Sequence, residues 1–119
     1  MKRTTRAIGK EYEDLACAYL IEKGYTIAER NFTMRGGEID IIAKQNGTVV
    51  FVEVRYRADD KHGSPLETVT AHKQRRICRT AQFYLLRHGY PGNVNIRFDV
   101  IAVTGEKASH IENAFEFAF

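Results

Sequence analysis

Two carboxylates, Asp40 and Glu53, lie in runs of the sequence that otherwise read as buried strands. Between these runs stands Asn46-Gly47, a dipeptide typical of a two-residue β-hairpin turn. Pairing outward from that turn places Asp40 directly opposite Glu53, with their Cβ atoms roughly 5 Å apart on one face of the hairpin. Like charges in this position destabilise a hairpin, so the sequence predicts a compensating positive charge nearby.

A divalent cation would supply that charge. Burying an unpaired carboxylate is costly, and Mg²⁺ prefers hard oxygen ligands, usually one or two carboxylates together with phosphate oxygens. We therefore expect Asp40 and Glu53 to bind Mg²⁺, with Mn²⁺ as an alternative ion. A second interpretation is a cross-strand salt bridge between Glu38 and Arg55, which the same pairing also places opposite each other. That bridge would dilute the repulsion without a metal.

Two further charged residues begin the apolar stripes of predicted helices. Glu13 is expected to point toward the sheet and to contribute to the metal site; the alternative is an acid favoured simply by the helix dipole. Lys73 opens the stripe of the second helix. It could supply an ammonium group to the site, or it could extend its charged end into water as lysines commonly do.

Basic residues surround these groups. The segment "HKQRRICR" places Arg75 and Arg79 on one helix face with Arg76 beside them, and Arg57 follows the hairpin. A solvated basic face is the default interpretation of such a cluster. Because these residues flank the predicted metal site, we favour contacts with nucleic-acid phosphates. The candidate contacts are Arg57, Lys73, Arg75, Arg76 and Arg79.

The elements that must position these groups follow from residue periodicity and turn signals. They are a helix over residues 6–23, a strand over 25–32, hairpin strands over 38–45 and 48–56, a helical segment over 64–88 with a break near Thr70, and strands over 95–105 and 109–115. This α-β-β-β-α-β-β order predicts one α/β domain over residues 1–119, with a central mixed β-sheet and flanking helices.

The hairpin is expected to lie at the centre of that sheet, because both of its faces carry apolar residues. One face is predicted to be wholly apolar, and its members are Ile39, Ile41, Ala43, Val50, Val52 and Val54.

Composition narrows the function classes. A chain of 119 residues has the size of one globular domain, and a net charge of +3 is compatible with nucleic acid without being diagnostic. No apolar run reaches the ~20 residues that span a bilayer, and the first residues lack a secretory signal, so we expect a cytoplasmic protein without membrane contact. Cys17 and Cys78 are expected to be free buried thiols. Scattered histidines without a CxxC motif argue against zinc.

Five segments together resemble one family over nearly the whole chain. They are "GKEYEDLA", "GGEIDIIA", "VFVEVRYR", "HKQRRI" and "RFDVIAV" with the later "IENAF". These motifs are similar to those of the YraN-like family of uncharacterised bacterial proteins. That family is grouped with the PD-(D/E)xK nuclease superfamily and is similar to archaeal Holliday-junction resolvases. The resemblance implies a restriction-endonuclease-like core.

The resemblance also implies roles for individual residues. Asp40 matches the metal-binding aspartate of the superfamily, Glu53 the acid of its E-x-K element, and Glu13 the helix glutamate of resolvase-like members. Arg55 stands where the superfamily has lysine. Because arginine is always protonated, it cannot act as a base, but it can stabilise charge on a transferring phosphoryl group. The implied catalytic residues are thus Glu13, Asp40, Glu53 and Arg55.

Three functions remain open at this point. The first is a Mg²⁺-dependent endonuclease acting on DNA, with branched or otherwise structured DNA as a candidate substrate. The second is a nucleic-acid-binding module without turnover, suggested by Arg55, whose partner could be a DNA-processing protein. The third is a protein-interaction domain in which the acids are structural. Analogy with resolvases adds the expectation of a homodimer.

Overall fold

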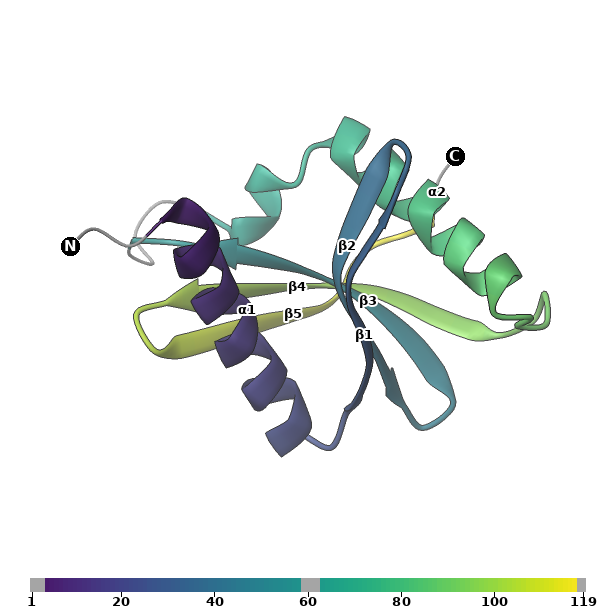
Figure 1. The fold of residues 1–119 in the computed structure, drawn as a ribbon, viewed down its shortest axis with the longest axis horizontal. Coiled ribbons are helices and arrows are strands. Elements are labelled where there is room, and N and C mark those ends of the chain that lie inside the picture. Colours follow the sequence, from purple (N-terminus) through teal and green to yellow (C-terminus); the bar gives the residue numbers. More distant parts are fainter. Residues whose placement is uncertain (1–3, 59–62, 118–119) are drawn as a thin grey trace.

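The computed structural model describes residues 4–58 and 63–117. Within them, two helices flank a five-stranded sheet (Figure 1). The elements are α1 (Thr5–Glu22), β1 (Thr26–Met34), β2 (Gly37–Gln45), β3 (Thr48–Tyr56), the single 3₁₀ turn η1 (Pro65–Thr68), α2 (Ala71–Arg87), β4 (Asn95–Thr104) and β5 (Lys107–Phe115). The predicted α/β class, mixed sheet and element order are confirmed.

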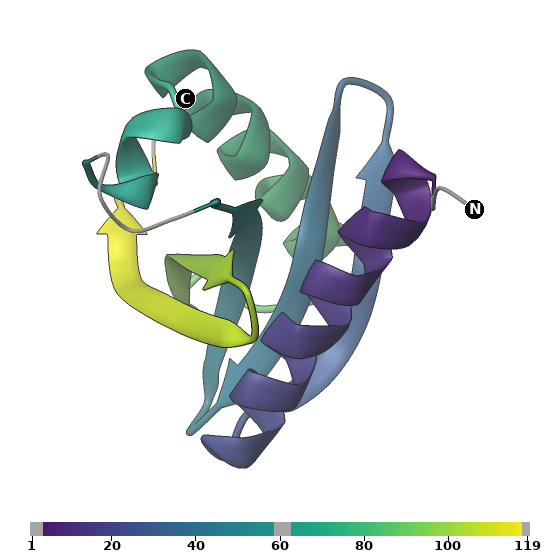
Figure 2. The same cartoon turned by 90° about the vertical axis from the view of Figure 1, so that its left-hand side faces the viewer.

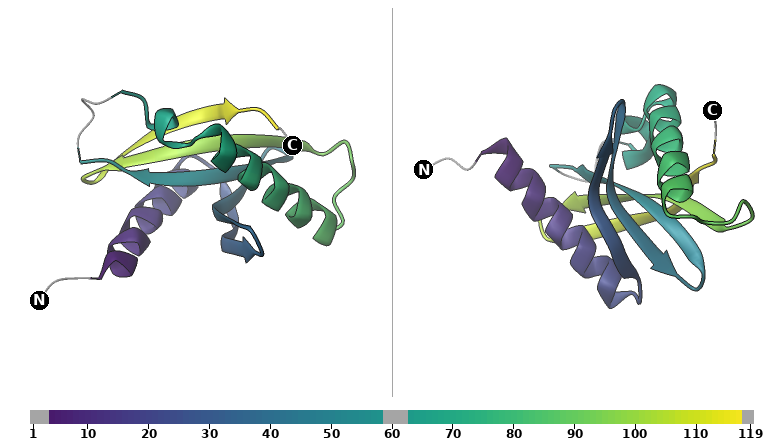
Figure 3. Two further views of the ribbon diagram at one scale, coloured as in Figure 1. Left: turned by 90° about the horizontal axis from the view of Figure 1, so that it is seen from above. Right: turned by 45° about the vertical axis from the view of Figure 1, so that its right-hand side comes forward.

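The sheet has the strand order β1-β2-β3-β4-β5. β3 and β4 are parallel, and the other neighbouring pairs are antiparallel. A parallel pair requires a crossover connection, which η1 and α2 supply. α1 packs on one face of the sheet and α2 on the other, as Figures 2 and 3 show. The central strands are therefore covered on both sides, as the two apolar faces of the hairpin predict.

The break predicted near Thr70 separates η1 from α2. The Thr70 side chain accepts a hydrogen bond from the backbone N–H of Lys73 at 3.2 Å, which caps α2. Ser64 accepts one from the N–H of Leu66 in the same way, but the helical turn it begins ends at Thr68. The fresh start at Thr70 places Lys73 in the first turn of α2, next to the sheet.

In a regular strand, successive side chains point to opposite faces of the sheet. β1 and β2 both depart from this alternation, and they do so at neighbouring positions. Ile39 packs in the core beneath α2, whereas Ile41, two residues further along, packs in the core beneath α1. In a regular strand these side chains would share a face, so the prediction that they do is wrong. The change coincides with Asn31, which adopts a φ of +53°, and with a missing ladder pair between Asn31 and Asp40. The register of β1 and β2 is the same on both sides of this irregular step and shifts only earlier, between Ile27 and Glu29.

β2 and β3 separate beyond this point. Their ladder runs from Gln45–Thr48 at the turn to Ile41–Val52 and ends there. β2 then continues beside β1, and β3 continues beside β4 as far as Tyr56 (Figure 1). The predicted ladder pairs beyond Ile41–Val52 are therefore absent. The separation opens the sheet at the end of the hairpin where the paired acids lie.

α2 packs closely over the turn between β1 and β2. A Cβ atom added to Gly37 would overlap Oγ1 of Thr80. Nε of Arg76 donates a hydrogen bond of 2.7 Å to the carbonyl oxygen of Gly36, which has a φ of +93°. The two glycines thus allow the turn to approach α2 and hold one wall of the opening in place.

Two further observations bear on the sequence predictions. Cys17 and Cys78 are buried and form no disulfide within the described residues, as expected. No helix in the described part of the chain is long and apolar enough to span a membrane.

Candidate metal and nucleic-acid site

Asp40 lies where β2 leaves β3, and its side chain continues the contact between the two strands. Oδ2 of Asp40 accepts a hydrogen bond of 2.8 Å from the backbone N–H of Val54. The Asp40 side chain is half-buried, and Glu53, one residue earlier in β3, is buried. Asp40 and Glu53 line one cleft together. The two acids are thus neighbours although the ladder has ended before them.

The electrostatics of Asp40 reflect this neighbour. Burial raises the pKa of Asp40 to about 7, and the Glu53 carboxylate adds to the increase. The hydrogen bond from Val54 acts in the opposite direction, because it favours the charged form. The repulsion that the sequence predicts between these acids is therefore present in the fold.

Two cations approach Glu53 from different elements. Nζ of Lys73 in α2 lies 3.2 Å from Oε1 of Glu53, and Nη2 of Arg55 in β3 lies 3.8 Å from the same oxygen. The sequence left two interpretations of Lys73, an ammonium group in the site or a charged end in water. The structure has the first, because the ammonium group contacts Glu53. Both cations therefore contact the same acid of the pair. Asp40 has no direct cationic partner within the described residues.

The predicted salt bridge between Glu38 and Arg55 is absent from the described residues. Glu38 is exposed and pairs in register with Thr33 of β1, because β2 has already left β3 at this position. Arg55 instead donates from Nη2 to the carbonyl oxygen of Thr68 at 3.4 Å. Its Nε is buried and has no hydrogen-bond partner in the part of the chain that the structure describes. The guanidinium therefore retains unused donor capacity beside Glu53.

Glu13 is buried on α1 and points toward the sheet, as predicted. Its Oε1 accepts hydrogen bonds of 2.9 Å from Nε of Arg30 and from Nδ2 of Asn31. Both donors come from the irregular step of β1 next to Asp40, so Glu13 holds that step against α1. Within residues 4–58 and 63–117, no group of three or more His, Cys, Asp or Glu side chains is arranged to hold a metal ion. A role for Glu13 as a metal ligand stays a prediction.

Asp40 borders two clefts on opposite sides of the opening. The cleft on the α1 side has a volume of about 940 Å³ and also contains Glu13 and Arg30. The cleft on the α2 side has a volume of about 240 Å³ and contains Glu53 and Lys73. Asp40 thus lies between the larger cleft along α1 and the smaller cleft that contains the charged groups beneath α2.

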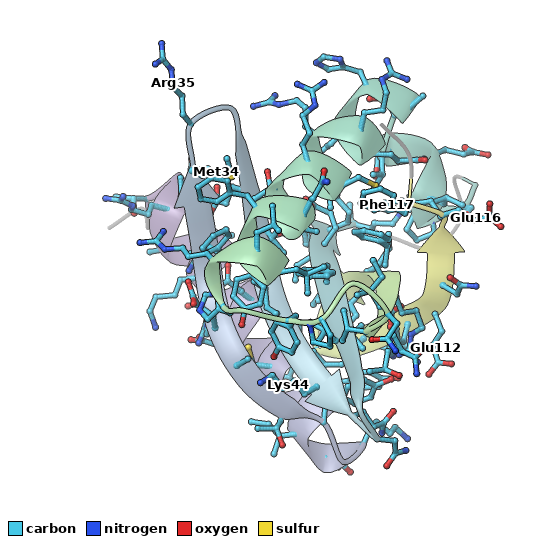
Figure 4. All side chains as sticks on the ribbon, turned by 90° about the vertical axis from the view of Figure 1, so that its right-hand side faces the viewer. Met34, Arg35, Lys44, Glu112, Glu116 and Phe117 are labelled. Atoms are coloured by element: carbon cyan, nitrogen blue, oxygen red, sulfur yellow. The ribbon has the colours of Figure 1, made fainter. Side chains whose placement is uncertain are left out.

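The predicted nucleic-acid contacts divide into two groups. Arg75 and Arg79 are exposed on α2. Arg76 binds the turn between β1 and β2, and Nη1 of Arg57 donates a hydrogen bond of 2.6 Å to the carbonyl oxygen of Gly63, so both have structural contacts. Figure 4 looks onto α2 and shows Arg35 pointing away from the tip of the β1–β2 hairpin. Arg35 is an exposed basic residue that the sequence analysis did not select.

Asp99 is a buried aspartate that sequence reasoning missed. It accepts hydrogen bonds from Nε and Nη2 of Arg97 (2.9 and 2.8 Å), Nε2 of His110 (2.6 Å) and the N–H of Asn113 (2.9 Å). Burial alone would raise the pKa of Asp99, but the hydrogen bonds from His110 and Arg97 lower it below its usual value. Asp99 is therefore a satisfied structural anion between β4 and β5, in contrast to Asp40.

The comparisons with known proteins agree with the motifs. Residues 12–103 match the family described as Uncharacterised protein family UPF0102. A UPF0102 protein of Persephonella marina is 49% identical over 111 residues, which cover 93% of this chain and 95% of that protein. A UPF0102 protein of Lachnoclostridium phytofermentans is 46% identical over 116 residues, with coverages of 98% and 97%.

One solved structure, "Crystal structure of SSO0001", aligns with a TM-score of 0.42 and 17% identity. The alignment covers 92% of this chain and 52% of the other, so this chain spans about half the length of that protein.

Proposed function

The chain belongs to Uncharacterised protein family UPF0102, the YraN-like family that its motifs resemble, and we propose that it is a metal-dependent nuclease acting on DNA. The observation that carries this proposal is the pair Asp40 and Glu53. Asp40 has a pKa of about 7 because it is buried beside Glu53, and it borders both clefts. A metal ion would relieve the repulsion between the two carboxylates, and the clefts leave room for a phosphate beside it.

The donor set fits Mg²⁺ or Mn²⁺. Asp40 and Glu53 offer hard carboxylate oxygens, and a cation between them would relieve the repulsion that raises the pKa of Asp40. Because no third acid completes the group within the described residues, water and the phosphate of the substrate would fill the remaining positions. When bound, the ion would lower the pKa of a coordinated water and polarise the phosphodiester. We expect weak metal binding in the absence of DNA.

Lys73 supports catalysis in place of the lysine that Arg55 replaces. Its ammonium group, 3.2 Å from Glu53, enters the site from α2 instead of from β3. It can orient Glu53 and neutralise charge near the scissile phosphate. Arg55 contributes a second positive charge on the same side of Glu53. Arg75 and Arg79 on the exposed face of α2 would bind the DNA backbone.

The test is cleavage of duplex, single-stranded and four-way DNA with Mg²⁺ or Mn²⁺. We expect Asp40→Asn and Glu53→Gln each to lower cleavage by about 100-fold or more, within the range for an electrostatic catalytic group. Glu22→Gln, which removes an exposed acid at the end of α1, is the matched control and should retain activity. Unchanged cleavage by both site variants after rigorous purification would refute the nuclease proposal.

A nucleic-acid-binding module without turnover is the second candidate. It is favoured by the two cations already on Glu53, which compensate one acid of the pair without a metal. This function predicts salt-sensitive DNA binding that survives Asp40→Asn and Glu53→Gln, with no cleavage in Mg²⁺ or Mn²⁺. The same set of variants therefore separates the two candidates.

A further inference from the structure

A stacked pair of tyrosines lines the larger cleft, and the chemistry described above does not use it. Tyr12 of α1 and Tyr56 at the end of β3 stack with their ring centroids 4.3 Å apart and their planes at 10°. Both line the cleft that contains Asp40. Tyr56 is 53% exposed although Tyr12 is stacked on it, so about half of the residue is in contact with water.

The pair is held in place before any ligand arrives. Tyr12 is fixed by a helix and Tyr56 by a strand, and the two elements pack against each other in the core that α1 covers. An aromatic ring that is supported on one face loses little conformational freedom when a planar group stacks on the other. Tyr56 is therefore a preorganised surface for a flat ligand.

The rest of the cleft indicates what that ligand is. Arg6 and Lys10 lie one helical turn apart on the face of α1 that lines the cleft, and Arg30 lines it from β1. Gly9 stands between them, and an added Cβ there would have no neighbouring atom within 4 Å, so the helix borders open space. Arg30 is ion-paired with Glu13 and Asp14, and Nζ of Lys10 lies 3.4 Å from Oδ2 of Asp14. Acids also line the cleft, so it carries charge of both signs, with basic side chains along α1. Basic side chains beside an exposed aromatic ring are the combination that binds single-stranded nucleic acid.

We propose that Tyr56, supported by Tyr12, stacks on an unpaired base of a nucleic acid whose backbone runs along Arg6 and Lys10 toward Asp40. A base inside a regular duplex is covered by its neighbours on both faces and cannot stack on a side chain unless it is unpaired and displaced. The substrate class is thus nucleic acid with a single-stranded segment at the site. This inference rests on the proposed function and specifies its substrate.

The test measures binding in the presence of EDTA, so that it does not depend on cleavage. The probes are a single-stranded oligonucleotide carrying the fluorescent base 2-aminopurine and a blunt duplex of the same length. Tyr56→Leu should weaken single-strand binding by about 5- to 150-fold, the range for loss of one base–aromatic stack. Tyr56→Phe should retain affinity. Blunt-duplex affinity should change by less than about twofold in both, because no base stack is lost.

Two controls define the outcome. Phe83→Leu removes an aromatic ring on α2 that is 45% exposed, and it should leave single-strand binding unchanged. When the wild-type protein binds the oligonucleotide, stacking on Tyr56 should quench the fluorescence of 2-aminopurine at one position. Replacing the base at that position with an abasic site should weaken binding. This measurement uses only the wild-type protein, so it does not depend on the folding of a variant. Equal single-strand binding by wild type and a folded Tyr56→Leu, or no quenching at any position, would overturn the stacking proposal.

The same experiments separate this inference from the nuclease proposal. Metal-dependent cleavage together with Tyr56-independent binding would leave the nuclease intact and refute the stacking. Tyr56-dependent binding with no cleavage in any metal would support the stacking and refute the nuclease. Failure of the wild-type protein to bind single strands at low salt would overturn the stacking proposal directly.

Discussion

The backbone N–H of Val54 donates its hydrogen bond to the side chain of Asp40, at 2.8 Å, beyond the last ladder pair of β2 and β3. The carboxylate thus satisfies a backbone donor that separation of the strands would otherwise leave without a partner. The same contact holds Asp40 between the two clefts. The hydrogen bond therefore links β2 and β3 at the point where their ladder ends and the site begins.

Asp40→Asn should stabilise the protein at high pH. The folded-state pKa of Asp40 is about 7 against an ordinary value of 3.8, so the native state binds the proton more tightly than the unfolded chain. Stability attributable to this group therefore falls as the pH rises from about 4 to about 7. Asparagine keeps an acceptor for Val54 without the charge. Thermal melts should show a higher Tm for the variant at pH 8 and a smaller difference at pH 5; a difference independent of pH would contradict this origin.

Metal binding should release a proton. With a pKa near 7, Asp40 is mostly protonated at pH 6 and mostly ionised at pH 8, so the apparent affinity for Mg²⁺ should increase about tenfold between these values. Calorimetry in two buffers with different ionisation enthalpies measures the released proton. Asp40→Asn should abolish both the proton release and the stabilisation by Mg²⁺. Binding that is independent of pH would place the ion elsewhere.

Lys73 should matter more for cleavage than for affinity. Lys73→Met removes the ammonium 3.2 Å from Glu53 and is expected to lower the cleavage rate by about 100-fold. One lost phosphate contact changes affinity far less. Arg55→Lys restores the lysine of the E-x-K element and should retain or increase cleavage. If Lys73→Met cleaves like the wild type while Arg55→Lys is inactive, Arg55 and not Lys73 is the essential cation.

Two glycine substitutions should have opposite effects on stability. Gly9 lies inside α1 and faces open space, so Gly9→Ala should raise the free energy of unfolding by about 0.5–1 kcal/mol. Gly37→Ala should lower it, because the added Cβ would overlap Oγ1 of Thr80. Urea denaturation measures both. A destabilised Gly9→Ala would mean that the helix is not formed at that position in solution.

The exposed arginines of α2 should set the salt dependence of DNA binding. Replacing Arg75 and Arg79 together with glutamine should reduce the slope of log affinity against log salt by about 2 for duplex DNA, because each phosphate contact contributes roughly 0.9. Arg87→Gln, at the far end of the same helix, is the matched control. An unchanged slope in the double variant would exclude this face from the interface.

Local features of the chain could be predicted from its sequence. Asn46 and Gly47 both adopt positive φ, as the predicted hairpin turn requires, and they set the register of the first five pairs of β2 and β3. The new helix at Thr70 follows from a capping side chain three residues from the N–H it binds. The proximity of Asp40 and Glu53 also follows from the hairpin turn, because both lie just beyond the last pair whose register it sets.

Tertiary structure decided the rest, because it depends on contacts between residues distant in the sequence. At the irregular step of Asn31 and Asp40, Ile39 lies on the other face from Ile41, and β2 leaves β3. That separation breaks the expected pair of Glu38 and Arg55. Only packing of α2 on the sheet brings Lys73 to Glu53. The sequence therefore predicted that Asp40 and Glu53 are neighbours, because both flank one hairpin. The packing of distant elements determined which cations contact Glu53.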